Sequence, residues 1–184
     1  MKHLKQFISA LILVSALTAT VLSVYMFATK PKTAFVNLTR LYNEFELKKS
    51  LEQQLTSVQQ LRQKTLDSLE LNLKTLSRNI EAIDAQKMKD EYNSRIAEFE
   101  NRKQEYLYKQ KTFGDDNSNL SDQYSVRIWK QLNQYVKDFG DANHYTYIMG
   151  GDGSGSMMYA DQSDDLTETL VTYTNSRYKG ETKN

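Results

Sequence analysis

The sequence predicts an α+β protein in which a long antiparallel helical hairpin, a coiled-coil arm, is inserted in a small β-rich oligomerisation body, preceded by an N-terminal membrane or signal helix. Three observations predict this fold class: an uncharged N-terminal segment, about a hundred residues of helical periodicity from Thr39 onward, and short β-rich runs on both sides of that stretch. The chain has 184 residues and one proline, which fits one domain with an appendage.

The composition excludes several classes of function. The chain has no cysteine and two histidines, which rules out disulfides, thiol nucleophiles and thiolate zinc sites and argues against a histidine-rich metal centre. From residue 31 onward, 21 Lys and Arg stand against 23 Asp and Glu, with no clustered basic excess. We therefore expect no nucleic-acid partner and no cofactor.

Residues 1–30 are predicted to be a signal anchor or a signal peptide. Residues 7–28 form 22 uncharged positions, and about 20 apolar residues suffice to span a bilayer. The end of the segment, around Tyr25 and Phe27, lacks a small-x-small cleavage site. We expect a retained membrane anchor, with signal cleavage after Ala19 or Ala28 as the alternative.

Residues 31–39 are predicted to form the first strand of the body. Pro31 marks a boundary, and a β-rich run follows it. Asn37 or Thr39 is a suitable cap for the helix that begins here, because a short polar side chain can accept a hydrogen bond from an unpaired backbone N–H. The residues that would share one face of the strand are Ala34, Val36 and Leu38.

Residues 40–140 are predicted to form the arm, with a reversal near 84–90. The first helix carries apolar residues in steps of three and four, which is the seam of a coiled coil. Arg62 occupies a seam position between Val58 and Leu66, in two steps of four that form a stutter. The main seam residues are Leu66, Leu69, Leu73, Leu76, Ile80 and Ile83.

The returning helix carries a weaker seam, with polar residues at two of its positions. Its apolar members include Tyr92, Ile96 and Phe99. The Gly, Asp, Asn and Ser residues at 114–119 predict a break in this helix.

Residues 141–184 are predicted to complete the body with a β-hairpin and a short C-terminal helix. The hairpin would pair 145–149 with 156–160 around a glycine-rich loop. That loop lacks the G-K-[ST] sequence and the following helix of a phosphate-binding loop. The body alone is too small for reliable independent stability, so we expect oligomerisation.

Four short motifs in this order and spacing give the chain a family resemblance. They are Ala34-Phe35-Val36-Asn37, Phe113-Gly114, Met158-Tyr159-Ala160-Asp161 and Asp165-Leu166-Thr167. Residues 32–178 resemble the Skp/OmpH family of periplasmic chaperones. The resemblance implies a homotrimer with a barrel-like body, whose three arms enclose a cavity that holds unfolded outer-membrane proteins without ATP.

The resemblance also assigns the residues of the trimer body. They are Phe35, Val36, Leu38, Tyr147, Ile148, Met149, Met157, Met158 and Tyr159. Residues 40–113 of the arm depart from the basic arms of an archetypal member, because they hold 14 Lys and Arg and 12 Asp and Glu. Tyr106, Tyr108 and Tyr124 are candidate client contacts, although aromatic residues at helical spacing also serve helix pairing.

Two functions of different classes follow. The first is an ATP-independent holding chaperone in the periplasm, tethered to the inner membrane by residues 7–28 or released after signal cleavage. The second is a membrane-anchored coiled-coil scaffold that bridges components of the cell envelope. We expect no enzyme, because the sequence offers no nucleophile with a base, no acid/base pair and no metal constellation.

Overall fold

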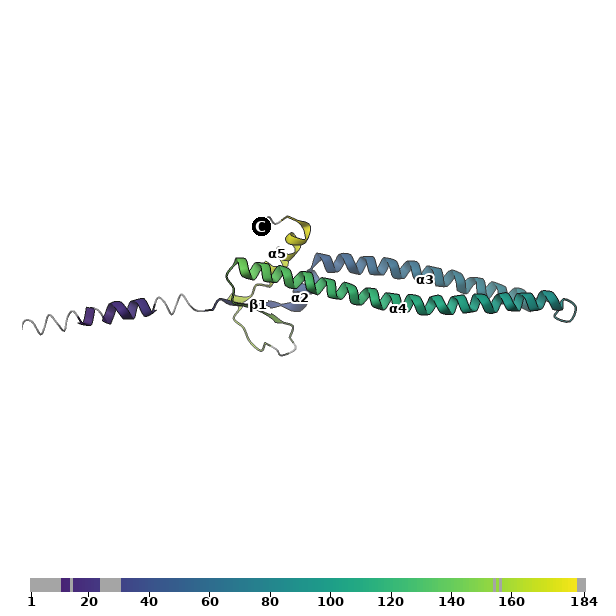
Figure 1. The fold of residues 1–184 in the computed structure, drawn as a ribbon, viewed down its shortest axis with the longest axis horizontal. Helices are drawn as coiled ribbons and strands as arrows, with labels where there is room; N and C mark the ends of the chain where they lie inside the picture. The colour runs from purple at the N-terminus through teal and green to yellow at the C-terminus, as the bar shows by residue number, and fades with distance from the viewer. Residues whose placement is uncertain (1–10, 14, 24–30, 154, 156, 182–184) are drawn as a thin grey trace, which may run out of the picture.

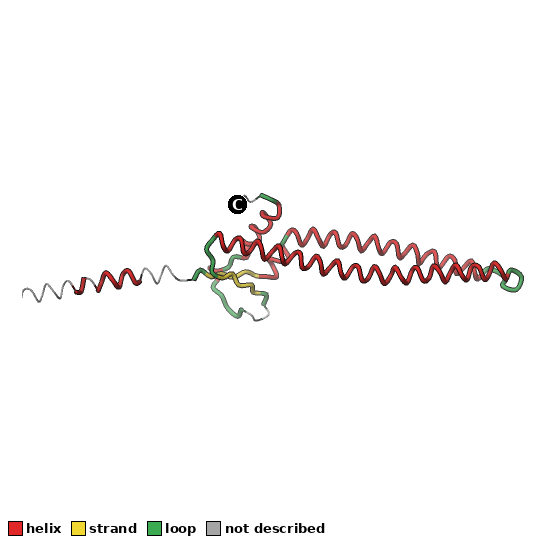
Figure 2. Tube along the Cα trace, viewed as in Figure 1, coloured by secondary structure: helices red, strands yellow, loops and turns green. Residues whose placement is uncertain are grey.

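The computed structural model describes residues 11–13, 15–23, 31–153, 155 and 157–181. Long helices lie side by side and project from a small body in Figure 1, and Figure 2 shows that the strands are confined to this body. These described residues are mostly helical and contain one two-stranded sheet. The elements are β1 (Thr33–Asn37), α2 (Leu38–Glu44), α3 (Glu46–Glu81), α4 (Lys89–Ala142), β2 (Tyr147–Gly151), the 3-10 helix η1 (Gln162–Asp164) and α5 (Thr167–Lys179).

The two strands pair in parallel, with Ala34 opposite Ile148 and Val36 opposite Gly150. Parallel neighbours need a long crossover connection. Here the whole arm, α3 and α4, is part of the connection that returns the chain to the same end of the sheet. The sheet of the body is therefore completed by a strand that follows the whole arm in the sequence.

The predicted β-hairpin is wrong. Residues 147–151 pair with β1, and residues 157–160 form no strand. Gly153 and Gly155 have φ angles of 81° and 96°, which turn the chain out of the extended direction. The inner edge of β2 is already paired with β1, so the glycine-rich run connects the sheet to α5 as a loop. The body is consequently less β-rich than predicted.

The hydrophobic core lies at the root of the arm. It gathers β1, α2, the first turns of α3, the last turns of α4, and α5. Of the two predicted caps, Asn37 and Thr39, it is the Asn37 side chain that caps α2, accepting a hydrogen bond from the Arg40 N–H at 2.9 Å. The buried members of the core are Val36, Leu41, Phe45, Leu47, Leu51, Ile128, Leu132, Phe139, Leu170 and Val171.

The predicted break at 114–119 is also wrong, because α4 runs through it without interruption. Gly114 costs a helix about 1 kcal/mol relative to alanine. The surrounding turns compensate, since α4 packs against α3 on both sides of this point: Ile128 shares the core with Leu51, and Leu76 lies beside Arg102. Asp116 and Asn117 also find a partner on α3, the side chain of Arg62. The turn between the two arm helices occupies residues 82–88, against the predicted reversal near 84–90.

The predicted anchor, residues 7–28, lies partly outside the described residues. Residues 11–13 and 15–23 are helical, and their large apolar side chains are exposed. Among the residues that the structure describes, no helix combines the length and the apolar character needed to cross a membrane.

Candidate functional site

The outer face of the small sheet exposes large apolar side chains. Successive residues of a strand point to opposite faces, and in this sheet Ala34 and Val36 face the core. On β2, Tyr147 is 63% exposed and Met149 is 50% exposed. A sheet of two strands is too small to be stable by itself, so this face is a natural place for further packing.

The segment after the glycine loop extends this apolar surface. A Cβ atom at Gly151 would lie 2.6 Å from the Met157 Cε atom, so the glycine allows Met157 to pack against the strand backbone. Met158 is 90% exposed and Tyr159 is 84% exposed. A continuous apolar surface of this kind marks an interaction site, whereas single exposed apolar side chains do not.

The residues predicted for the trimer body thus fall into three groups. Val36 is buried in the core of the single chain. Those half-buried are Phe35, Leu38, Ile148 and Met157. Those exposed are Tyr147, Met149, Met158 and Tyr159. The structure therefore brings one group into the core and leaves the last available to another chain.

The two edges of the sheet differ. On the far side of β1, the Leu166 N–H donates to the Phe35 carbonyl at 2.9 Å, and the Asn37 N–H donates to the Thr167 hydroxyl at 2.8 Å. The far edge of β2 pairs with no strand within the described part of the chain. An open edge beside exposed apolar side chains is a template for pairing with another chain.

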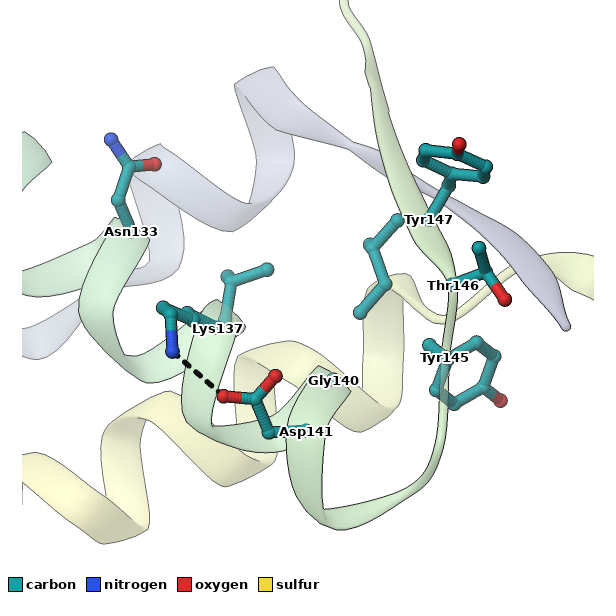
Figure 3. A pocket seen from close by; sticks show the side chains of 9 residues that line it. Asn133, Lys137, Gly140, Asp141, Tyr145, Thr146 and Tyr147 are labelled. Atoms are coloured by element: carbon teal, nitrogen blue, oxygen red, sulfur yellow. Dashed lines mark hydrogen bonds and ion pairs between the residues drawn. The ribbon is translucent and has the colours of Figure 1, made fainter. Parts of the chain in front are cut away.

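A shallow pocket of about 280 Å³ lies between the end of α4 and β2 (Figure 3). Its charged groups, Lys137 and Asp141, pair with each other at 2.8 Å. This hydrogen bond raises the pKa of Lys137 above its usual range. A Cβ atom added at Gly140 would lie 3.5 Å from the Ile148 side chain, which is an ordinary van der Waals contact, so the position of β2 does not require a glycine here. We interpret the pocket as a surface notch where the sheet joins the arm.

The predicted arm seam is best packed in its distal part. Leu76 and Ile80 are buried. Leu66, Leu69 and Leu73 of α3 are half-buried. Ile83 is half-buried too, but it lies in the turn that follows α3 and not in the predicted helix. On the returning helix Tyr92 and Phe99 are half-buried, whereas Ile96 is 37% exposed.

A polar layer interrupts the seam at the predicted stutter. The Arg62 guanidinium donates to the side chains of Asn117 and Asp116 and lies 5.5 Å from the centre of the Phe113 ring. Its ion pair with Asp116 spans 3.3 Å. The stutter therefore carries a charged side chain that joins the two arm helices.

The three candidate client contacts have different environments. Tyr108 is 71% exposed on the arm. Tyr106 is half-buried beside Gln110, whose amide donates to its hydroxyl at 3.4 Å. Tyr124 packs against the core cluster at the arm root. Of the three, only Tyr108 presents most of its surface to solvent.

The structure adds arm residues that the sequence reasoning missed. Large apolar side chains on the arm are exposed at Leu61, Leu71, Met88, Leu107 and Val126. Leu61, Leu71, Leu107 and Val126 lie outside the three-four spacing of the seam, and this position is their signal in the sequence. Met88 fits that spacing, one step of four before Tyr92, yet it is 47% exposed because it lies in the turn before α4. Arg62 lies opposite Asp116, and Leu76 lines the same pocket as Arg102, so Leu71 lies at about the level of Leu107 and Tyr108.

The charges of the arm are largely paired within each helix. Glu98 accepts hydrogen bonds from Arg102 and Arg95, and these hold its pKa below the usual range. Similar pairs three or four residues apart join Lys48 to Glu52 and Lys74 to Glu70. The arm therefore presents no strongly basic face. In the described residues, no group of three or more His, Cys, Asp or Glu side chains could hold a metal ion.

The comparison with protein families decides the classification. The sequence profile described as "Outer membrane protein (OmpH-like)" matches residues 32–173. The chain belongs to the OmpH-like family. The match begins just before β1 and ends within α5, so it covers the arm and the body of this OmpH-like chain.

A solved structure has the same fold as the OmpH-like chain. It is a crystal structure from Caulobacter crescentus CB15, described as an OmpH-like outer membrane chaperone. The likeness has a TM-score of 0.69 at 14% sequence identity, and covers 85% of this chain and 89% of that chain. A comparison with curated proteins found no match.

Proposed function

We propose that this OmpH-like protein is an ATP-independent holding chaperone that keeps unfolded outer-membrane proteins from aggregating in the periplasm. The observation that carries the proposal is the projecting arm, whose outer positions expose apolar side chains that helix pairing does not use. Family membership and the chaperone description of the similar structure support the same function. An unfolded β-barrel protein offers alternating apolar side chains, which such a surface can bind weakly at many points.

We further propose a homotrimer built around the sheet. The open edge of β2 and the exposed Tyr147, Met149, Met158 and Tyr159 support an interface between copies of this chain. Three arms around one body would enclose a space that no single arm provides. The family resemblance implies the number three.

Binding is proposed to involve no catalysis. Holding requires contacts that form and break without a covalent step, and the exposed arm residues are apolar side chains suited to such contacts. The arm helices supply a long surface in place of one deep pocket. Nucleotide is therefore expected to have no effect on client binding.

A set of arm variants tests the proposed binding surface. Replacing Leu71, Leu107 and Tyr108 by serine removes exposed apolar area, so we expect roughly tenfold more protein to be needed to suppress aggregation of an unfolded β-barrel protein. Light scattering after dilution of that client from denaturant measures the effect.

The matched control replaces three exposed polar arm residues, Gln60, Asn101 and Gln104, by serine. It should retain full suppression, and both triple variants should retain the native mass. If the apolar variant protects the client as well as the control does, the arm surface is not the binding site. If the unaltered protein fails to suppress aggregation, the membrane-anchored scaffold becomes the better proposal.

We propose that residues 7–28 tether the protein to the inner membrane, with release after signal cleavage as the alternative. In the described part of this segment Leu13, Leu17 and Leu22 are 63 to 70% exposed. Tethering would place the arms where clients leave the export machinery, raising the local concentration of chaperone.

Membrane fractionation followed by N-terminal sequencing tests the tether. We expect the unprocessed chain in the membrane fraction. A variant with Tyr25→Ala and Phe27→Ala creates a small-x-small site and should be released. A mature N-terminus near Thr20 or Thr29 in the soluble fraction of the unaltered protein would contradict tethering.

A further inference from the structure

The chain bends sharply between α2 and α3 at a single residue. Helix α2 ends at Glu44, α3 begins at Glu46, and Phe45 between them is extended, with φ −70° and ψ 122°. Neither proline nor glycine occurs between Thr39 and Gly114. The local sequence therefore favours one continuous helix, and the corner must be held by contacts from elsewhere in the fold.

One side chain from α5 contacts both sides of this corner. The Asn175 Oδ1 atom accepts a hydrogen bond from the Glu46 N–H at 2.8 Å. Its Nδ2 atom donates to the Glu44 carbonyl at 3.1 Å. The bend removes the neighbouring-turn partners that these two backbone groups would have in a continuous helix. A single amide, 129 residues further along the chain than Glu46, replaces both.

The residue at the corner is itself fixed by the same helix. Phe45 is 0% exposed. Its ring makes edge contacts with Tyr135 of α4 at 6.2 Å between centroids and with Tyr178 of α5 at 6.1 Å. The extended conformation of Phe45 is thus coupled to the docking of α5.

The other arm helix has no such dependence. Helix α4 runs from the arm tip into the core without a break, and Ile128, Leu132 and Phe139 bury it there. The direction in which α4 leaves the body is therefore set by the helix itself, since it has no bend at the root of the arm. The path of α3 out of the body depends instead on how the corner is held.

We propose that Asn175 is a positioning residue that holds the α2–α3 corner and so fixes the direction in which α3 leaves the body. The functional meaning rests on the proposed chaperone activity, because the direction of the arms would set the width of the space that they enclose. The structural claim can be tested without a client.

A proline substitution provides a rescue that isolates the corner. Proline is well suited to the first position of a helix, where it needs no N–H partner, and it favours an extended residue before it. Phe45 is already extended, so Glu46→Pro should impose the same corner without Asn175. If this change restores the corner in the absence of Asn175, then Asn175 acts by positioning the corner and not by a general contribution to packing.

The experiment uses the full-length chain, which contains no cysteine of its own. Spin labels are placed on cysteines introduced at Gln53 of α3 and Ala142 of α4, both exposed, and the labelled protein is diluted with unlabelled chain. Their distance distribution and hydrogen exchange at the amides of 49–51 are compared among variants.

Asn175→Leu should broaden the distance distribution and speed amide exchange about tenfold, because two partly buried backbone groups lose their partner. Thr172→Leu, on the exposed side of α5, should change neither quantity. The double variant Glu46→Pro/Asn175→Leu should restore both. The proposal would be overturned if Asn175→Leu changed neither the distance distribution nor the amide exchange rate. It would also be overturned if the double variant kept the broad distribution or failed to fold.

Discussion

Replacing Val36 by aspartate is expected to unfold the body and abolish the proposed trimer together. Val36 is 3% exposed and belongs to the core cluster. An unpaired carboxylate in this position costs several kcal/mol, against a total stability of about 5–15 kcal/mol for a typical domain. Circular dichroism and native mass measurements on residues 31–184 should show loss of cooperative unfolding and loss of the trimer.

Leu73→Asp is the matched variant on the arm. Leu73 is half-buried in α3, outside the core cluster at the arm root. We expect partial loss of helical signal while the mass of the proposed trimer persists, because the body does not depend on this contact. A Leu73→Asp protein that loses the trimer as completely as Val36→Asp does would contradict the separation of arm and body.

The second large effect is expected for Phe45→Ala. The Phe45 ring is fully buried at the corner between α2 and α3, and truncating such a ring to alanine costs about 3–5 kcal/mol. The free energy of unfolding from denaturant titration should fall by this amount in residues 31–184. The control, Tyr108→Ala on the exposed arm, should change it by less than about 0.5 kcal/mol. A Phe45→Ala loss within the range of the control would show that the corner does not stabilise the fold.

The arm could be predicted because its signal is local. Three-four spacing from Leu66 to Ile83 places those side chains on one face, and Leu76 and Ile80 are indeed buried against the returning helix. The cap at Asn37 was predictable for the same reason, because its partner is three residues away. Helical periodicity and capping need no information from distant parts of the chain.

The predictions that are wrong concern segments whose structure is determined by contacts with distant parts of the chain. The polar residues at 114–119 predict a break in the helix, yet pairing with Arg62 and packing on α3 keep α4 continuous. The predicted hairpin pairs two neighbouring segments of the sequence, whereas in the structure Ile148 pairs with Ala34, on the other side of the whole arm in the sequence. The corner at Phe45 carries no local signal, since its partner Asn175 lies in the last helix.

The candidate binding surface was only partly predictable. Tyr108 was found as an aromatic residue on the arm, whereas Tyr124 proved to pack against the core. Exposed leucines such as Leu71 and Leu107 became visible only when the pairing of the two helices showed which face points outward. Periodicity identifies the buried seam of a helix and says much less about which exposed residues are used.

The mass of a client complex tests the central claim most directly. An unfolded outer-membrane β-barrel protein is diluted from denaturant into residues 31–184 without nucleotide, and the products are examined by sedimentation and native mass spectrometry. We predict a dispersed complex of three copies of the chain with one client, and no change on adding ATP. A client that sediments as aggregate while the chain remains alone would contradict the account.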